Sequence, residues 1–184
     1  MADKKDVIEI VKVGTILFFI TAIAAAILAG VNGFTAPVIA ENKRQAEEKA
    51  MKDVLPNATE FVKSEYAELT DSLVSEIYEG TGAGYVVKVN PKGYGGTISL
   101  IVGIDNEYKV TGVEVISQSE TAGLGANCTK EDFRAQFVGK TENVEVVKNG
   151  AEGNQVDAIS SATITTKAVT SGVNAAILAV KGGK

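Results

Sequence analysis

The longest apolar run in this 184-residue chain lies near the N-terminus. Residues 13–31 are nineteen consecutive positions without a charged side chain, close to the roughly 20 residues that an α-helix needs to cross a hydrocarbon core of about 30 Å. A cleaved signal peptide is the alternative, because the small residues at 24–30 could serve as a cleavage site, but its apolar region usually has only about 7–15 residues. The pattern therefore favours a retained transmembrane helix over residues 13–31, preceded by a short segment, residues 1–12.

Basic residues around this run predict its orientation. Lys4, Lys5 and Lys12 precede the run, and the next basic residues are Lys43 and Arg44. The positive-inside rule then places the N-terminus in the cytoplasm and the following domain outside it, anchored in the cell (inner) membrane by a single pass. The run is rich in alanine, which either lets partner helices approach closely in the membrane or simply fills a lone anchor.

After the apolar run, the pattern predicts a connecting helix and then one compact domain. Residues 32–56 have helical spacing of apolar and charged positions, with Pro37 suited to the first turn of a helix and Pro56 to its end. The remaining residues, 57–184, are enough for one domain with its own core.

Strands and helices alternate irregularly in this domain. Segments rich in β-branched residues predict strands at 85–89, 97–104, 110–116 and 144–147. Helical spacing predicts a short helix at 130–138, with Thr129 or a neighbour as its cap, and a longer one at 164–180. The apolar face of the longer helix would consist of Val169, Val173, Ala176, Ile177 and Val180. Strands grouped together with helices around them predict the α+β class.

The composition excludes several kinds of chemistry. The chain has no histidine, no tryptophan and one cysteine, Cys128. It therefore lacks the residues for an imidazole metal site, a Ser-His-Asp triad, an iron–sulfur cluster or an internal disulfide, and Cys128 is expected to be a small buried residue. The net charge of −5 and the absence of a basic patch argue against nucleic-acid binding. Any redox chemistry would require an organic cofactor.

The most informative segment lies just before the last predicted helix. Here Thr163 stands among small residues, with Asp157 six positions upstream. A phosphate attached to this hydroxyl would lie near the positive end of the helix dipole and its unpaired N–H groups. The alternative is that these serines and threonines only cap the helix, which is a common role for them.

This segment resembles the attachment motif of the FMN-binding domain family, in which a flavin transferase esterifies FMN through its phosphate to the last threonine. The resemblance implies covalent FMN on Thr163, within a motif formed by Asp157, Ser160, Ser161 and Ala162. Ser161 stands where the family usually has glycine. Attachment is expected to survive this exchange unless the backbone requires a positive φ.

Two glycine-containing segments strengthen the resemblance, although each could be a plain turn. Residues 120–125 resemble the family's Glu-Thr-Pro-Gly-Leu-Gly segment, with Ala122 in place of proline, and residues 93–96 match its Gly-Tyr-Gly-Gly stretch. The resemblance implies that Tyr94 stacks on or shields the flavin ring. It also implies that the ring or ribityl chain contacts Glu120, Thr121, Gly123, Leu124 and Gly125. Lys167 is a candidate partner of the phosphodiester or else a solvated lysine.

The order of these features is similar to that in the RnfG family, the G subunits of Rnf complexes, which are membrane-bound, ion-translocating (Na⁺ or H⁺) ferredoxin:NAD oxidoreductases. The NqrC family, the C subunits of the Na⁺-translocating NADH:quinone reductase, shares the motif, but its members are similar to a chain longer than this one. The resemblance implies an electron-transfer subunit that carries covalent FMN, works with other membrane subunits of the complex and needs a flavin transferase for maturation. The alternatives are the corresponding subunit of a Na⁺-translocating NADH:quinone reductase, a stand-alone extracytoplasmic flavoprotein and a non-redox, membrane-anchored assembly domain.

Overall fold

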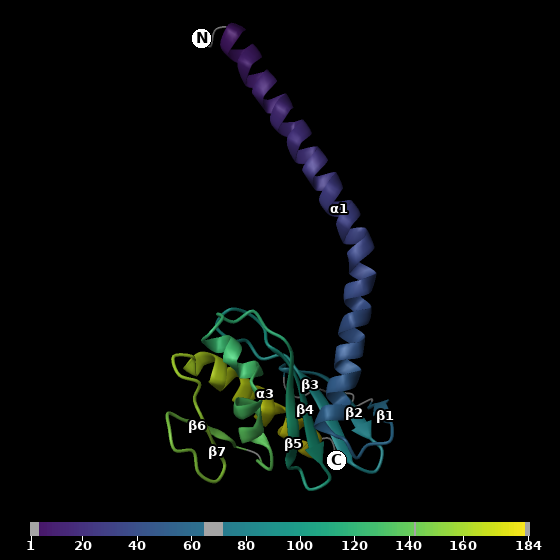
Figure 1. Ribbon diagram of the computed structural model, residues 1–184, viewed down its shortest axis with the longest axis vertical. Coiled ribbons are helices and arrows are strands. Elements are labelled where there is room, and N and C mark those ends of the chain that lie inside the picture. The colour runs from purple at the N-terminus through teal and green to yellow at the C-terminus, as the bar shows by residue number, and fades with distance from the viewer. Residues whose placement is uncertain (1–3, 65–71, 142, 183–184) are drawn as a thin grey trace. The chain divides into compact units, whose positions relative to one another are not determined.

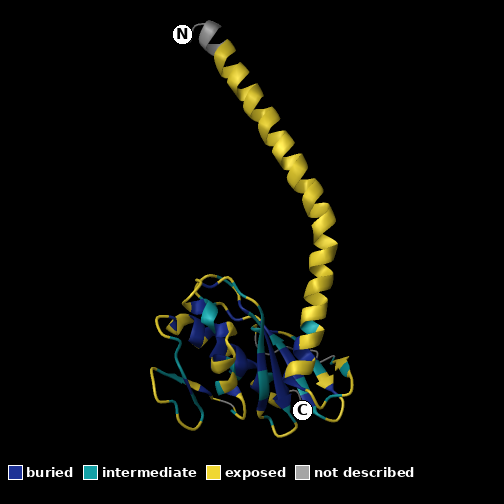
Figure 2. Cartoon of the chain, viewed as in Figure 1, coloured by how far each residue is buried: buried dark blue, intermediate teal, exposed yellow. Residues whose placement is uncertain are grey.

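The computed structural model describes residues 4–64, 72–141 and 143–182, which fall into two compact units, Met1–Arg44 and Gln45–Lys184. Helix α1 (Lys4–Val54) forms the described part of the first unit and continues into the second. Among the described residues it is the one helix that is long and apolar enough to cross a membrane, and its residues 8–46 are all exposed (Figure 2).

The predicted transmembrane and connecting segments form one continuous helix. Pro37 lies inside α1 instead of beginning a second helix, so that expectation was wrong. Proline removes one backbone hydrogen bond and tends to kink a helix, but helical residues on both sides carry α1 through this position. The last turns of α1 belong to the compact second unit, which therefore begins before residue 57.

The second unit is built on an antiparallel sheet of five strands in the order β1-β2-β3-β4-β5 (Figure 1). The strands are β1 (Phe61–Lys63), β2 (Val74–Gly80), β3 (Gly84–Val89), β4 (Ser99–Asp105) and β5 (Val110–Ser117). The rest of the unit contains the 3₁₀ helix η1 (Gly125–Thr129), α2 (Glu131–Arg134), η2 (Ala135–Phe137), a parallel pair β6 (Glu145–Val147) and β7 (Gln155–Asp157), and α3 (Thr163–Gly182). This architecture confirms the predicted α+β class, and β1, β2 and β7 are additions to the predicted strands.

The predicted helix at 130–138 is divided into α2 and η2. Lys130, not Thr129, is the residue that precedes α2, and its side chain makes no capping hydrogen bond. Thr129 instead donates its hydroxyl hydrogen to the carbonyl oxygen of Ala126 within η1, at 2.9 Å. A short helix without a side-chain cap is only weakly stabilised by itself, so tertiary contacts of Phe133 and Phe137, both buried, hold this segment.

The sheet is covered on both faces, which explains the nearly continuous apolar sequences of β3 and β4. One face packs against α3, and all five residues predicted for the apolar face of α3 are buried there with Val87, Val89 and Leu100. The opposite face carries Val86 and Ile101, which pack against the last turns of α1. Figure 2 shows the buried residues gathered in the sheet and in α3.

The C-terminal end of α1 fits closely against the sheet. The hydroxyl of Thr111 donates to the carbonyl oxygen of Val54, at 2.5 Å, and so satisfies an acceptor that the end of a helix leaves free. Gly103 and Gly112, which are cross-strand partners, leave room for this contact. A Cβ added at Gly103 would lie 2.4 Å from the Val54 carbonyl oxygen, and one at Gly112 would lie 3.0 Å from Val54 Cα.

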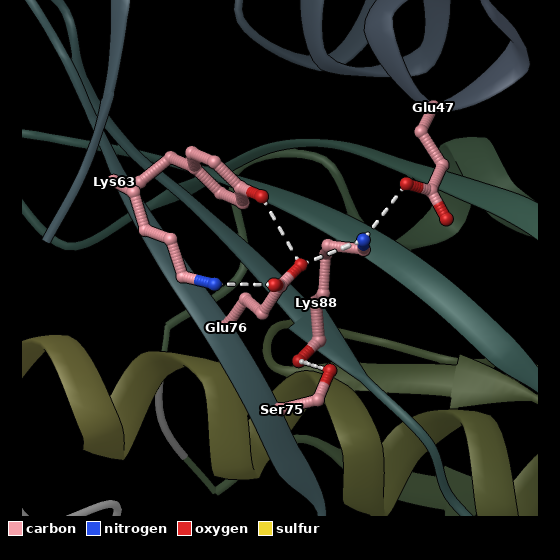
Figure 3. Close-up of polar contacts among 6 residues, drawn as sticks. Glu47, Lys63, Ser75, Glu76 and Lys88 are labelled. Atoms are coloured by element: carbon pink, nitrogen blue, oxygen red, sulfur yellow. Dashed lines mark hydrogen bonds and ion pairs between the residues drawn. The ribbon is translucent and has the colours of Figure 1, made fainter. Parts of the chain in front are cut away.

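Charged side chains on the same side of the sheet link α1 to β1, β2 and β3 (Figure 3). Lys88 Nζ lies 2.8 Å from Glu47 Oε2 and 2.7 Å from Glu76 Oε2, and Lys63 Nζ lies 2.5 Å from Glu76 Oε1. Hydrogen bonds from Lys63 and then Lys88 lower the pKa of Glu76 to about 2. Burial lowers the pKa of Lys88, but Glu47 and Glu76 raise it by more. Lys63, Glu76 and Lys88 are therefore charged at neutral pH, and with Glu47 they link the end of α1 to the sheet.

Candidate functional site

A cleft of about 560 Å³ lies between the loop after β3, the segment after β5 and the start of α3. This volume is within the range of about 300–1,000 Å³ that is typical of ligand sites. The cleft brings together eight of the residues that the sequence predicted, namely Tyr94, Glu120, Thr121, Leu124, Gly125, Ser161, Ala162 and Thr163. Ile164 and Thr165 complete the lining and were not predicted.

Thr163 is the first residue of α3, and its side chain is exposed. Ala162 precedes it, and the Ala162 carbonyl accepts the N–H of Thr166, at 3.0 Å. Because alanine has no side-chain acceptor, this helix start lacks the usual cap. In the described chain no side chain accepts from the N–H groups of residues 163–165. These N–H groups can therefore receive an anion.

Ser161 has a φ of 61°, in the left-handed region that favours glycine. The turn into α3 thus has a positive φ at the position where the family motif has glycine. The exception stated for attachment, a backbone that requires a positive φ, is therefore met at this position. Ser161 nevertheless adopts this φ, at an energetic cost, two residues before Thr163.

Replacing Ser161 by glycine is expected to stabilise the protein by about 1 kcal/mol, since glycine adopts this φ without steric strain. Chemical denaturation of the full chain in detergent would measure the change. Ser160→Gly is the matched control: Ser160 is exposed and has no positive φ, so glycine there should cost up to about 1 kcal/mol through lost backbone entropy. Equal destabilisation by both substitutions would contradict this interpretation of the turn.

Glu120 is buried, with 8% of its surface exposed, at the base of the cleft. Its Oε1 accepts from the Gly95 N–H at 2.7 Å, and its Oε2 accepts from the Tyr94 N–H at 3.3 Å and from the Thr165 hydroxyl. Burial raises the pKa of Glu120, but these hydrogen bonds and one from the Gly96 N–H together lower it below its ordinary value. The carboxylate is therefore charged at neutral pH.

Exposed apolar side chains surround the opening of the cleft. Tyr94 is 73% exposed, Ile164 56% and Leu124 42%. They come from the three segments that form the cleft. Large apolar groups are rarely left this exposed together without a ligand or a partner, so these side chains are available to pack against one.

The other predicted site residues lie outside this cleft. Asp157, Ser160 and Gly123 line a neighbouring cleft of about 450 Å³, which shares Leu124 and Ser161 with the first. The Asp157 carboxylate accepts from the Ala151 N–H at 3.0 Å, and the Asp157 N–H donates to the side chain of Gln136 at 2.7 Å. Asp157 thus fixes the backbone ahead of Thr163, and Gln136 is a supporting residue that the sequence did not indicate.

Lys167 is exposed on the first turns of α3 and is not among the lining residues of either cleft.

Cys128 is fully buried, as expected. Burial, and then the charge of Glu120, raise the pKa of the Cys128 thiol to about 11, so the reactive thiolate is scarce at neutral pH. Thr163 shares the cleft with two other exposed hydroxyl residues, Thr121 and Ser161, and differs from them in being the first residue of α3.

Known families match both parts of the chain. Residues 93–178 match the family described as FMN-binding domain, and residues 1–54 match the RnfG N-terminal region. The chain is 38% identical to the G subunit of the Na⁺-translocating ferredoxin:NAD⁺ oxidoreductase complex of Acetobacterium woodii, over 90% of this chain and 89% of that protein. The chain belongs to the RnfG family. This family assignment confirms the resemblance seen in the sequence.

Other members of the RnfG family are similar over the same length. The G subunit of the proton-translocating ferredoxin:NAD⁺ oxidoreductase complex of Clostridium ljungdahlii is 37% identical over 99% of this chain and 97% of that protein.

A solved structure from a different complex has a similar fold. The C subunit of the Na⁺-translocating NADH-quinone reductase from Parabacteroides distasonis has a TM-score of 0.56 at 19% identity, covering 78% of this chain and 94% of that one. That likeness confirms the fold.

Proposed function

We propose that this chain is the electron-transfer subunit of a membrane-bound, ion-translocating ferredoxin:NAD oxidoreductase and carries FMN esterified to Thr163. The observation that carries the proposal is the exposed Thr163 hydroxyl at an uncapped helix start, beside a cleft in a chain that matches the FMN-binding domain family. Relatives named as Na⁺-translocating and as proton-translocating match at nearly equal identity. The proposal therefore rests on the electron-transfer role that they share.

The residues of the cleft have distinct roles in this proposal. The free N–H groups at the start of α3 and its dipole stabilise the phosphate charge. Tyr94, Leu124 and Ile164 shield the ring from water. Asp157 fixes the backbone ahead of the turn, and Ser161 has the positive φ within it. FMN, when bound, supplies the electron-accepting and electron-donating chemistry that the side chains lack. Covalent attachment keeps the cofactor in place outside the cytoplasm, where no pool of free FMN would replace it.

The family also supports a proposal for the partners. Relatives named as parts of these complexes support other Rnf subunits as the donor and acceptor of electrons. We further propose that a flavin transferase loads Thr163, with the N-terminus in the cytoplasm and the FMN domain outside. α1 would anchor the domain to the membrane subunits through residues 13–31.

Intact mass spectrometry tests this proposal on the full chain co-expressed with an active flavin transferase. The wild-type chain should gain the mass of FMN less one water, whereas Thr163→Ala should gain nothing. Thr141→Ala removes another exposed threonine hydroxyl and should load like the wild type. A wild-type chain that gains no mass beside an active transferase would overturn covalent attachment and leave Thr163 with only a structural role at the start of α3.

A further inference from the structure

The three segments that form the cleft meet at the carboxylate of Glu120. The Tyr94 and Gly95 N–H groups and the Thr165 hydroxyl all donate to it, although they come from segments 25–45 positions away in the sequence. These three hydrogen bonds occupy most of the roughly four lone-pair sites of a carboxylate. The protein itself thus satisfies this side chain.

Glycines around Glu120 make this arrangement possible. A Cβ added at Gly93 would lie 2.5 Å from Glu120 Oε1, and one added at Gly125 would lie 2.7 Å from Glu120 Oε2 and 2.6 Å from the Thr165 hydroxyl oxygen. Real Cβ atoms do not approach other atoms this closely. Gly93 and Gly125 therefore leave room for the carboxylate and for the Thr165 hydroxyl that donates to it.

We propose that Glu120 is a positioning residue, a buried anion that holds the three walls of the cleft together and places a fixed negative charge behind it. The resemblance in the sequence had implied direct contact with the flavin. Glu120 does line the cleft, and the role inferred here is one that it exerts through its neighbours. It holds the backbone that displays Tyr94, and it holds Thr165, two residues after Thr163. This inference rests on the proposed FMN role for its effect on the cofactor, but its effect on the protein is independent of loading.

A fixed charge has a consequence that a purely structural side chain lacks. Adding electrons to a cofactor in the cleft increases negative charge there, and a nearby carboxylate opposes this in a partly buried site. Glu120 therefore lowers the reduction potential of the flavin. Because its pKa is below the ordinary value, the charge is present throughout the neutral pH range.

Three variants of the full chain in detergent separate these effects. Glu120→Gln removes the charge and one acceptor with little change of shape, and Thr165→Val removes one donor but keeps the charge. Glu107→Gln removes a charge from a side chain that is 74% exposed in the β4–β5 turn, and is the matched control. Each variant is made with and without a flavin transferase. Three quantities are measured: the thermal midpoint without flavin, the loaded fraction by intact mass, and the midpoint potential of the loaded chain.

For Glu120→Gln we expect a thermal midpoint lower by roughly 5 °C or more, a several-fold lower loaded fraction and a higher midpoint potential. Thr165→Val should lower the thermal midpoint but keep the potential of the wild type, and Glu107→Gln should change none of the three. An unchanged thermal midpoint in Glu120→Gln would overturn the proposal. A lowered thermal midpoint with an unchanged potential would also overturn it, since Glu120 would then be only structural.

Amide hydrogen exchange on the wild-type chain without flavin keeps the proposal testable if Glu120→Gln does not fold. The N–H groups of Tyr94 and Gly95 should be protected although they lie in a loop, because both donate to a buried carboxylate. Exchange as fast as that of exposed loop amides would overturn the proposal. A wild-type chain that never loads would refute the FMN role but would leave the thermal and exchange results on Glu120 standing.

Discussion

Gly95→Ala is expected to lower the free energy of unfolding by about 3 kcal/mol and to abolish flavin loading. A Cβ at this position would lie 2.1 Å from the backbone carbonyl oxygen of Ser119, and backbone cannot move away as a flexible side chain could. Relief of this clash would move the Gly95 N–H away from Glu120, to which it donates at 2.7 Å. Overpacking and the loss of a charge-assisted hydrogen bond each cost about 1–3 kcal/mol. Urea denaturation and intact mass would measure the two effects.

Gly96→Ala is the matched control for this prediction. It adds the same methyl group one residue later, where the nearest atom is the Ser119 Cβ at 3.4 Å. This is an ordinary van der Waals contact, so the cost should stay below about 1 kcal/mol. If both variants lost stability equally, the loop would be sensitive to any loss of glycine, and the close approach at Gly95 would not be the cause.

Gly103→Ala is expected to release the end of α1 from the sheet and to cost about 2–3 kcal/mol. The added Cβ would lie 2.4 Å from the Val54 carbonyl oxygen and 2.5 Å from the Thr111 hydroxyl oxygen. It would therefore separate the two atoms whose hydrogen bond ends the helix. Urea denaturation in detergent gives the loss of stability, and limited proteolysis after α1 gives the local release.

The two neighbouring residues provide graded comparisons for this prediction. Gly112→Ala places its Cβ 3.0 Å from Val54 Cα, so it should cost less than Gly103→Ala. Thr111→Val removes only the hydroxyl and should cost about 1 kcal/mol. A Gly103→Ala variant as stable as Gly112→Ala, with no new cleavage after α1, would contradict the close fit described for this helix end.

The elements that the sequence predicted well are those with a regular period. The apolar face of α3 was predicted from its spacing, and β3 to β5 were predicted from runs of β-branched residues. Strand β2 lacks such a run, since its outward positions include Ser75, Glu76 and Glu79. A shift in register between Val74 and Glu76 also disturbs its two-residue period. Local pattern therefore could not identify this strand, which is stabilised by pairing on both sides.

The site was predictable as a set of motifs but not as an arrangement. Motif resemblance selected Thr163 and most of the cleft lining without indicating which side chain binds which. The hydrogen bond from Thr165 to Glu120 joins residues 45 positions apart, a separation for which sequence spacing gives no rule. The cost of serine at position 161 likewise depended on a backbone angle that only the fold reveals.

Cys128 makes this protein suitable for site-directed labelling without prior removal of cysteine. The thiol is fully buried, is the chain's sole cysteine and has its pKa raised to about 11. A maleimide or nitroxide reagent at neutral pH would therefore react with an introduced surface cysteine and leave Cys128 unmodified. Cysteine placed at the exposed Lys167 would report the distance between α3 and labelled lipid headgroups. The native chain thus provides a background for mapping the flavin domain against the membrane.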